Sequence, residues 1–286
     1  MGAFSILNNI AGLNAQGQLN INNSNLTRTL MRLSSGRRIN TGADDAAGLQ
    51  IADSLRANTR ALDQAVRNAN DGISVCQIAD GALAQMSEIL TRAVTLAEES
   101  ATGTVDSVGR ASLNAEFQQI QAEICRIANQ TNFNGKGIFT AAGINGSLGI
   151  FVGDIMAQSS ISVSIGLITA ANDLVTSLMG TDLSGVNMST QPGAVAALNT
   201  LKTAISTVSS GRASIGAGIN RLQSAVAVLQ NQSQNTQAAE STIRDANIAE
   251  EMTNLTKFQI LAQSGLAALS QANSNAQSVL TLFQGR

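Results

Sequence analysis

The amino-acid sequence predicts a mainly α-helical protein, with long helical hairpins and coiled coil from both termini and a small β-hairpin element at the centre of the chain. Pro192 is the only proline among 286 residues, and proline disfavours a helix interior by ~3 kcal/mol. Apolar residues recur three and four positions apart near both ends, as on the contact face of a coiled coil. Polar and apolar residues alternate between residues 160 and 165, which is typical of a β-strand.

The first helical stretch is expected over residues 3–33 and has an interrupted apolar stripe. Ile6, Ile10 and Leu13 are spaced four and three residues apart. A second apolar triplet at the end of the stretch is out of phase with them, so the stripe is not one continuous heptad seam. Residues 34–42 are rich in Ser, Gly and Asn, a composition that predicts a connector.

A second, longer helix is expected to begin at Asp44 and Asp45 and to run to about Ser100, with Gly48 and Gly72 as weak points. Acidic residues in a first turn interact favourably with the helix dipole, which favours this start. The helix also carries a regular coiled-coil seam with alternating spacings of three and four, made of Cys76, Ala79, Leu83, Met86, Leu90, Ala93 and Ala97.

A turn at residues 102–106 and a helix over 107–129 that folds back should follow, and residues 132–135, Asn-Phe-Asn-Gly, should end the helical half. The strand at 160–165 is expected to pair with residues 148–152. This β element should form the distal tip if the helices on its two sides pack against each other.

Helical periodicity returns after Pro192. Its next seam consists of Ile215, Ile219, Leu222, Val226 and Leu229. A last apolar stripe runs from Ile248 to Phe283. A lone helix cannot bury such a stripe, so we expect the C-terminal helices to pack against the N-terminal ones and against partners.

The residues that usually carry catalysis are missing or badly placed. The chain has no histidine, the commonest general base and metal ligand. The neighbouring carboxylates Glu250 and Glu251, like the earlier aspartate pair, point about 100° apart on a helix, so they are interpreted as helix-start and surface charges. The Gly216-x-Gly218 motif lacks the third glycine of a dinucleotide loop. We therefore expect no enzyme, no cofactor and no metal.

Partners of two further kinds are not expected. The net charge is −2, and no basic patch with interleaved aromatic residues occurs, which disfavours nucleic-acid binding. No apolar run approaches the ~20 residues of a membrane span. The N-terminus lacks a basic region followed by a continuous apolar run, so we expect no cleaved signal peptide. Cys76 and Cys125 are either bridged between antiparallel helices or free and buried.

Several segments resemble the bacterial flagellins, the subunits of the flagellar filament. They are SSGRRINTGADDAAGLQI at Ser34–Ile51, NANDGISVCQIADGAL at Asn68–Leu83, QTNFNG at Gln130–Gly135, RASIGAGINRL at Arg212–Leu222 and the stretch Glu240–Asn273, which begins ESTIRDANIAEEM and ends LSQAN. The matches cover nearly all of both helical halves and follow the order of the family.

The resemblance implies a structural subunit that polymerises through its terminal coiled-coil helices into the bacterial flagellar filament for motility. It implies export through the flagellar type III apparatus without a cleaved signal peptide, and an extracellular location. The partners would be further copies of the chain, a flagellar export chaperone, and the cap and hook-junction proteins. The implied parts are an N-terminal inner-core helix and connector (1–42), the N-terminal helical part of an outer-core domain (43–140), a short β-rich segment (141–189), the C-terminal outer-core helix (190–244) and the C-terminal inner-core helix (245–286).

The apolar stripes supply the residues expected in the core of the assembly: Ile6, Ile10, Leu13, Ile248, Met252, Leu255, Leu266, Leu269, Leu280 and Phe283. By resemblance, Arg92, Leu96 and Glu116 occupy the positions that contact the host Toll-like flagellin receptor, although Val94 replaces an arginine found in many strongly stimulating flagellins. Two alternatives remain open. One is a hook–filament junction protein, and the other is a secreted binding module that acts as a monomer.

Overall fold

The structure is a computed structural model, which describes residues 9–139, 147–153, 159–164 and 186–284. The chain forms two compact units. Unit 1 comprises Met1–Arg56 and Asn235–Arg286, and unit 2 comprises Ala57–Gln234. Long helices dominate both units, and two short antiparallel hairpins are the β-structure of the described residues, so the predicted fold class is confirmed.

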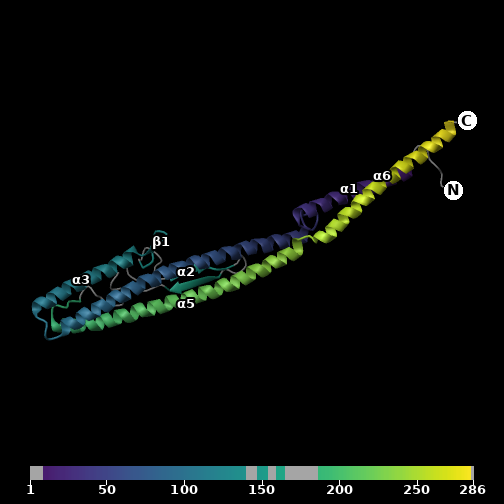
Figure 1. Cartoon of the computed structure of the whole chain (residues 1–286). Helices are drawn as coiled ribbons and strands as arrows, with labels where there is room; N and C mark the ends of the chain where they lie inside the picture. The colour runs from purple at the N-terminus through teal and green to yellow at the C-terminus, as the bar shows by residue number, and fades with distance from the viewer. Residues whose placement is uncertain (1–8, 140–146, 154–158, 165–185, 285–286) are drawn as a thin grey trace. The chain divides into compact units, whose positions relative to one another are not determined.

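Unit 1 is built on a pair of helices from the two ends of the chain. Helix α1 (Ile10–Ser35) packs against helix α6 (Ile248–Gln284) (Figure 1). The Nδ2 of Asn9, just before α1, donates a hydrogen bond of 3.2 Å to the carbonyl oxygen of Ala272, late in α6. The last turn of α1 forms an ion pair with the first turn of α6, so the two helices run antiparallel.

The ends of α1 carry local stop and start signals. The side chain of Asn9 accepts a hydrogen bond of 2.9 Å from the N–H of Gly12, as an N-cap residue does. Gly36 has a φ of 68°, the left-handed conformation that commonly ends a helix and that glycine adopts without steric cost. The helix expected over 3–33 therefore ends at Ser35, while its expected first residues lie outside the described part of the chain.

Helix α2 (Ala46–Ala101) begins later than its two aspartates suggested. The Oδ1 of Asp45 accepts a 2.9 Å hydrogen bond from the N–H of Gly48, so Asp45 precedes the helix as its cap. Asp44 lies in the connector, where its Oδ2 accepts a 3.1 Å bond from the N–H of Thr41. The prediction that both belong to the first turn is wrong, because short carboxylates bond backbone N–H groups outside helices as readily as they favour helix starts.

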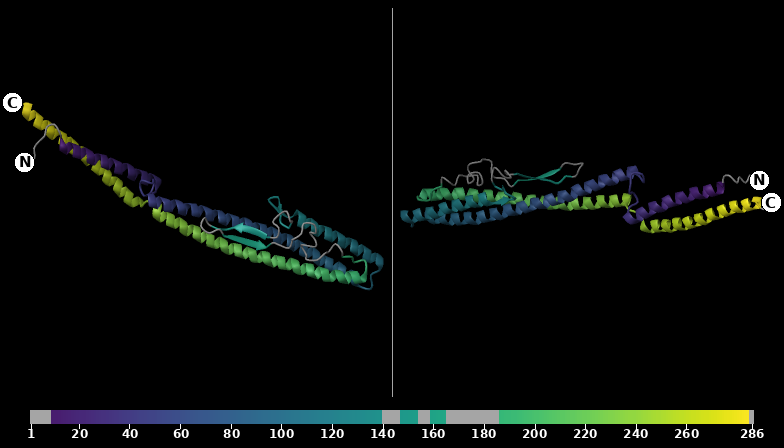
Figure 2. Two further views of the ribbon diagram at one scale, coloured as in Figure 1. Left: turned by 180° about the vertical axis from the view of Figure 1, so that it is seen from behind. Right: turned by 90° about the horizontal axis from the view of Figure 1, so that it is seen from above.

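Unit 2 contains most of α2, helix α3 (Ser107–Gln130) and most of α5 (Gln191–Arg244), which lie side by side (Figure 2). Asp106 caps α3 through a 2.7 Å bond from the N–H of Gly109. Pro192 occupies the first turn of α5, where its missing N–H costs nothing. The helix over 107–129 and the return of helix at Pro192 are thus confirmed.

The core of unit 2 lies between these three helices. Every residue of the seam predicted in α2, from Cys76 to Ala97, is fully buried. Helix α5 contributes Ile215, Leu222 and Leu229, with Ile219 and Val226 packed against the same core. Phe117, Ile124 and Ala128 of α3 complete it. Both predicted seams are confirmed because the spacing of three and four places these residues on one face of each helix.

The two hairpins are short. Strands β1 (Asn132–Phe133) and β2 (Lys136–Gly137) are joined by Asn134 and Gly135. Those two residues have φ values of 51° and 75°, the positive values that a two-residue hairpin turn of type I′ requires. From the sequence this Asn-Gly was expected only to end the helical half, and the hairpin was not predicted.

The larger hairpin pairs β3 (Ser147–Phe151) with β4 (Ser160–Ser164) in antiparallel register, with Gly149 opposite Ser162. The predicted pairing of two strands is therefore confirmed. Its predicted place at the distal tip is wrong, because the hairpin packs on the helices of unit 2. A Cβ built at Gly72 of α2 would lie less than 3.0 Å from Ile150.

A second glycine makes room for the same hairpin. A Cβ at Gly218 of α5 would lie less than 3.0 Å from the Cγ1 of Val163. Val163 and Ile150 are both buried. The two glycines therefore let the hairpin approach α2 and α5 closely. Gly72, expected as a weak point, lies inside an unbroken helix.

Candidate assembly interface

The surface of unit 1 exposes an unusual number of large aliphatic side chains. Eleven of them have exposed fractions of 39–64 %, and we call them the outer apolar set: Ile10, Leu13, Ile21, Leu30, Met31, Ile51, Ile248, Met252, Ile260, Leu261 and Leu266. Scattered exposed leucines are normal on a protein surface. So many on α1, α6 and the start of α2 indicate a surface that is covered by another chain.

The contact between α1 and α6, by comparison, fully buries no large apolar side chain among the described residues. The buried residues of α1 are Gly12, Asn22 and Thr29, and Glu251 is the buried residue among the described side chains of α6. Half-buried residues at heptad spacing complete this contact, which we call the α1–α6 seam: Leu19, Leu26 and Leu33 of α1, and Leu255, Phe258, Ala262, Gly265, Leu269 and Ala272 of α6. The fully buried residues of α1 and α6 are thus small or polar, and many large apolar residues of the two helices lie outside.

The residues predicted for the assembly core are divided between these two surfaces. Ile10, Leu13, Ile248, Met252 and Leu266 belong to the outer apolar set. The predicted residues Leu255 and Leu269 are half-buried in the α1–α6 seam. Ile6 and the side chains of Leu280 and Phe283 lie outside the described residues.

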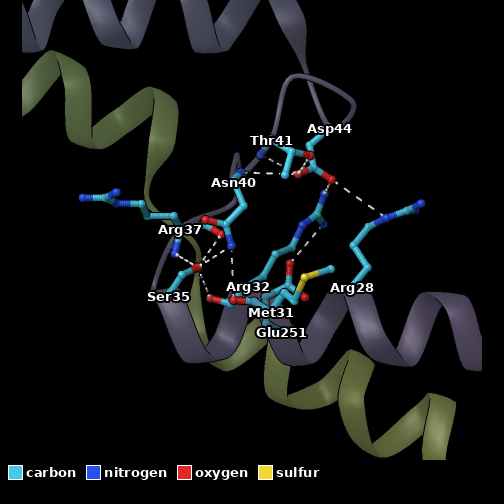
Figure 3. A network of polar contacts seen from close by, with 9 residues as sticks. All are labelled: Arg28, Met31, Arg32, Ser35, Arg37, Asn40, Thr41, Asp44 and Glu251. Carbon is cyan, nitrogen blue, oxygen red and sulfur yellow. Dashed lines mark hydrogen bonds and ion pairs between the residues drawn. The ribbon is translucent and has the colours of Figure 1, made fainter.

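A polar network joins the end of α1, the connector and the start of α6 (Figure 3). The guanidinium of Arg32 lies 3.3 Å from a carboxylate oxygen of Glu251 and 3.9 Å from one of Asp44. Arg28 also lies 3.9 Å from Asp44. Glu251 is only 7 % exposed, so its interpretation as a surface charge is wrong, because Arg32 supplies the partner that lets a carboxylate leave water.

Asp44 stays ionised under mildly acidic conditions. The hydrogen bond from the N–H of Thr41 lowers the pKa of its carboxyl below the usual value, with further lowering by the Thr41 hydroxyl, the N–H of Asn40 and the charge of Arg32. Partial burial opposes this lowering of the pKa. Hydrogen bonds to the charged form favour that form, so the ionised carboxylate of Asp44 stabilises the folded connector.

The connector is also fastened to the break between α5 and α6. The N–H of Arg38 donates a 2.7 Å bond to the carbonyl oxygen of Arg244, and the N–H of Ala246 donates a 3.0 Å bond to that of Gly36. The side chain of Arg244 is nearly buried and lies 3.1 Å from a carboxylate oxygen of Asp53. Backbone and side-chain contacts therefore hold the two helix breaks of unit 1 together.

In unit 2, the three residues proposed by resemblance for receptor contact do not share one environment. Arg92 of α2 and Glu116 of α3 form an exposed ion pair, 2.8 Å between Nη2 and Oε1. Leu96 is 1 % exposed and belongs to the core, so its side chain is not available to a partner. Leu96 lies beside the seam residues Ala93 and Ala97 of α2 and is buried with them, so the packed core surrounds its side chain.

The remaining chemistry of the described residues is sparse. Cys76 is buried, Cys125 is half-buried, and both are free thiols, whose pKa values burial raises. In the part of the chain that the structure describes, no group of three or more Cys, Asp or Glu side chains is arranged to hold a metal ion. No described helix has the length and apolar character needed to cross a membrane.

A helix pair made from both termini buries few large apolar side chains between its helices and exposes many. This arrangement defines a class of protein, a structural subunit whose apolar surface is covered by other chains. Two family models identify the member of this class. The bacterial flagellin N-terminal helical region matches residues 6–143, and the bacterial flagellin C-terminal helical region matches residues 198–283. The chain belongs to the bacterial flagellin family.

The relatives agree over nearly the full length. The flagellin of Halalkalibacterium halodurans is 37 % identical, covering 98 % of this chain and 99 % of its own. Flagellin FlaB1 of Treponema pallidum is 36 % identical with the same coverage. A crystal structure of Bacillus cereus flagellin is 29 % identical, covers 61 % of this chain and 94 % of its own, and has a TM-score of 0.48. The family models and the two full-length relatives make the chain a structural subunit of the bacterial flagellar filament.

Proposed function

We propose that this subunit polymerises by burying the outer apolar set of unit 1 against further copies of the chain. The observation that carries this proposal is the arrangement of α1 and α6, which leave Ile10, Leu13 and Leu266 more than half exposed while burying Asn22 and Thr29. A helix pair of this kind gains more from contact with other copies than from its own seam. Completion of unit 1 on assembly is coupled folding and binding, in which burial offsets the cost of ordering.

Burial of the outer apolar set supplies a large part of the free energy for assembly. Burying a whole aliphatic side chain contributes ~1.5–3 kcal/mol, and the eleven residues of the outer apolar set are each about half exposed. Complete burial would contribute on the order of 10 kcal/mol per subunit. A dissociation constant of 1 μM corresponds to ~8 kcal/mol. Association and ordering cost ~4 kcal/mol or more, so the outer apolar set alone gives an affinity weaker than ~1 μM, and a stable filament also needs the other contacts between copies.

The residues of the assembly core are proposed in two roles. Ile6, Ile10, Leu13, Ile248, Met252, Leu266, Leu280 and Phe283 contact neighbouring copies. Leu255 and Leu269 hold α1 and α6 together within one subunit, which follows from their half-buried places in the seam. The division of the chain into five parts, from 1–42 through 245–286, comes from the resemblance and belongs to this proposal.

The route to the filament is proposed from the resemblance. The chain leaves the cell unfolded through the flagellar type III apparatus, without a cleaved signal peptide, and assembles outside it. An export chaperone and the cap and hook-junction proteins are its expected partners. The protein performs mechanical rather than enzymatic work, because its function depends on interfaces between copies.

Recognition by a host Toll-like receptor is proposed at the exposed pair of Arg92 and Glu116. These side chains come from two helices and lie on one surface, where a partner can bind both. Replacing both by alanine should reduce receptor activation by the soluble subunit. Unchanged activation would remove these residues from the contact, whereas an exposed Arg126→Ala variant on α3 serves as the matched control.

The main proposal is tested by seeded polymerisation of the purified chain, observed by electron microscopy, with limited proteolysis of the monomer in parallel. Long filaments and cleavage confined to the two ends are expected. Growth that stops after one layer on a seed would favour the hook–filament junction alternative. A monomer that resists proteolysis at both ends and never polymerises would favour the binding module.

A further inference from the structure

The α1–α6 seam contains a repeat that permits more than one pairing of the helices. Leu19, Leu26 and Leu33 recur every seven residues along α1. On α6, Leu255, Ala262 and Leu269 follow the same interval. Equivalent apolar residues at heptad spacing allow one helix to slip along the other by seven residues with little change in apolar contact.

Polar and small residues remove this ambiguity. Asn22 is 7 % exposed in the middle of the seam, and a single buried asparagine in a coiled coil specifies register at a cost in stability. At one end Arg32 pairs with Glu251 at 3.3 Å. On the other side of Asn22 from Arg32, a Cβ added to Gly265 would lie 3.3 Å from a methyl carbon of Leu19, so the missing side chain at Gly265 makes room for this leucine.

The Arg32–Glu251 pair and the approach of Leu19 to Gly265 agree on one register, and the hydrogen bond from Asn9 to the carbonyl of Ala272 extends it to the far end. A slip of seven residues displaces α6 along α1 by about 10 Å. It would separate Arg32 from Glu251 and place Leu19 against a different residue. Since Glu251 is nearly buried, loss of its partner would leave an unpaired charge, which is costly.

We propose that Asn22 and the Arg32–Glu251 pair determine the register of α1 against α6, and that this register aligns the outer apolar set for a second copy. The inference rests on the proposed function, since register matters for assembly only if both helices contribute to one surface. The outer apolar set is divided between the two helices, so a slipped pair would present α1 residues such as Leu13 beside the wrong residues of α6. Asn22 and Arg32 are therefore positioning residues for polymerisation.

The test compares the variant Asn22→Leu/Glu251→Gln with the control Asn23→Leu/Glu250→Gln. The control makes the same chemical changes at neighbouring exposed positions. Spin labels on cysteines placed at the exposed residues Ser24 and Gln271, with both native cysteines replaced by serine, report the distance between the helices. Labelled subunits are diluted into filaments grown from excess unlabelled protein.

Wild type and control should give one distance. The seam variant should give a second population displaced by about 10 Å, or should add to seeds at least tenfold more slowly while unit 2 keeps its midpoint of urea unfolding. A single wild-type distance together with a wild-type elongation rate in the seam variant would overturn the inference. If the wild type never polymerises and both of its ends resist proteolysis, the proposed function fails, and the same labels on that folded monomer still decide whether the seam variant slips.

Discussion

The packing of the β3–β4 hairpin on Gly218 predicts different effects on stability for two alanine substitutions in one helix. Gly216 and Gly218 both lie in α5. A Cβ at Gly216 would meet nothing within 4 Å, whereas one at Gly218 would lie less than 3.0 Å from Val163. Gly216→Ala should stabilise unit 2, and Gly218→Ala should destabilise it relative to that control.

The magnitude follows from two contributions to the free energy of unfolding. Alanine is favoured over glycine in a helix interior by ~1 kcal/mol, and this gain applies to both variants. At Gly218 the added methyl group meets Val163, which is 2 % exposed and cannot move into solvent. Overpacking of such a site costs ~1–3 kcal/mol. The two variants should therefore differ by ~1–3 kcal/mol, a difference from which helix propensity cancels.

The assay is urea unfolding of the monomer followed by far-ultraviolet circular dichroism, because the chain has no tryptophan or tyrosine to report by fluorescence. Midpoints are compared at equal slope, which keeps the comparison independent of changes in exposed area. The double variant Gly218→Ala/Val163→Ala should lose less stability than the sum of its single variants, since the second change makes room for the first. Equal midpoints for Gly216→Ala and Gly218→Ala, or full additivity with Val163→Ala, would refute the reasoning.

Three further outcomes are expected. Leu266→Lys should abolish seeded polymerisation without lowering monomer helicity, because it places an unpaired charge in the proposed contact. The control Ser264→Lys, at an exposed polar position of α6, should still polymerise. Normal filaments from Leu266→Lys would contradict the proposed assembly surface. The pKa of Asp44 is lowered on folding, so its stabilisation of unit 1 is present above the ordinary carboxyl pKa and is lost as pH falls through the lowered value. Hydrogen exchange of the connector should therefore become faster at acidic pH. Asp44→Asn should abolish that part of the pH dependence. A thiol reagent on the native monomer should modify the half-buried Cys125 before the buried Cys76, and equal rates would mean that unit 2 opens as a whole.

Helix periodicity was predictable because it is a local property. The α2 seam from Cys76 to Ala97 is buried as its spacing requires, since a helix with a regular apolar face packs that face against any suitable partner. The strand pairing of residues 148–152 with the alternating segment that follows was predictable for the same reason. Helix ends were less predictable, because Asp44 and Asp45 are chemically alike. Only the path of the connector decides that Asp44 bonds the connector and that Asp45 caps α2.

Spacing did not predict which residues of an apolar stripe face the partner helix and which stay exposed. Leu266 and Leu269 belong to the same predicted stripe of α6, yet Leu266 is 57 % exposed and Leu269 is half-buried against α1. Residues three apart lie on neighbouring but different parts of a helix surface. Which part faces a partner depends on where that partner lies, so the division into seam and outer apolar set required the packed helices.

The amino-acid sequence therefore settles the helical fold class, the buried seams of unit 2 and, through its motifs, membership of the flagellin family. The packed structure settles which glycines receive the hairpin, that Leu96 is core and that Glu251 is a buried partner of Arg32. Helical periodicity acts between residues close in sequence, where the local order of the residues determines the outcome. Burial and pairing depend on residues that are more than two hundred positions apart, as Arg32 and Glu251 are, and these meet only when the chain is folded.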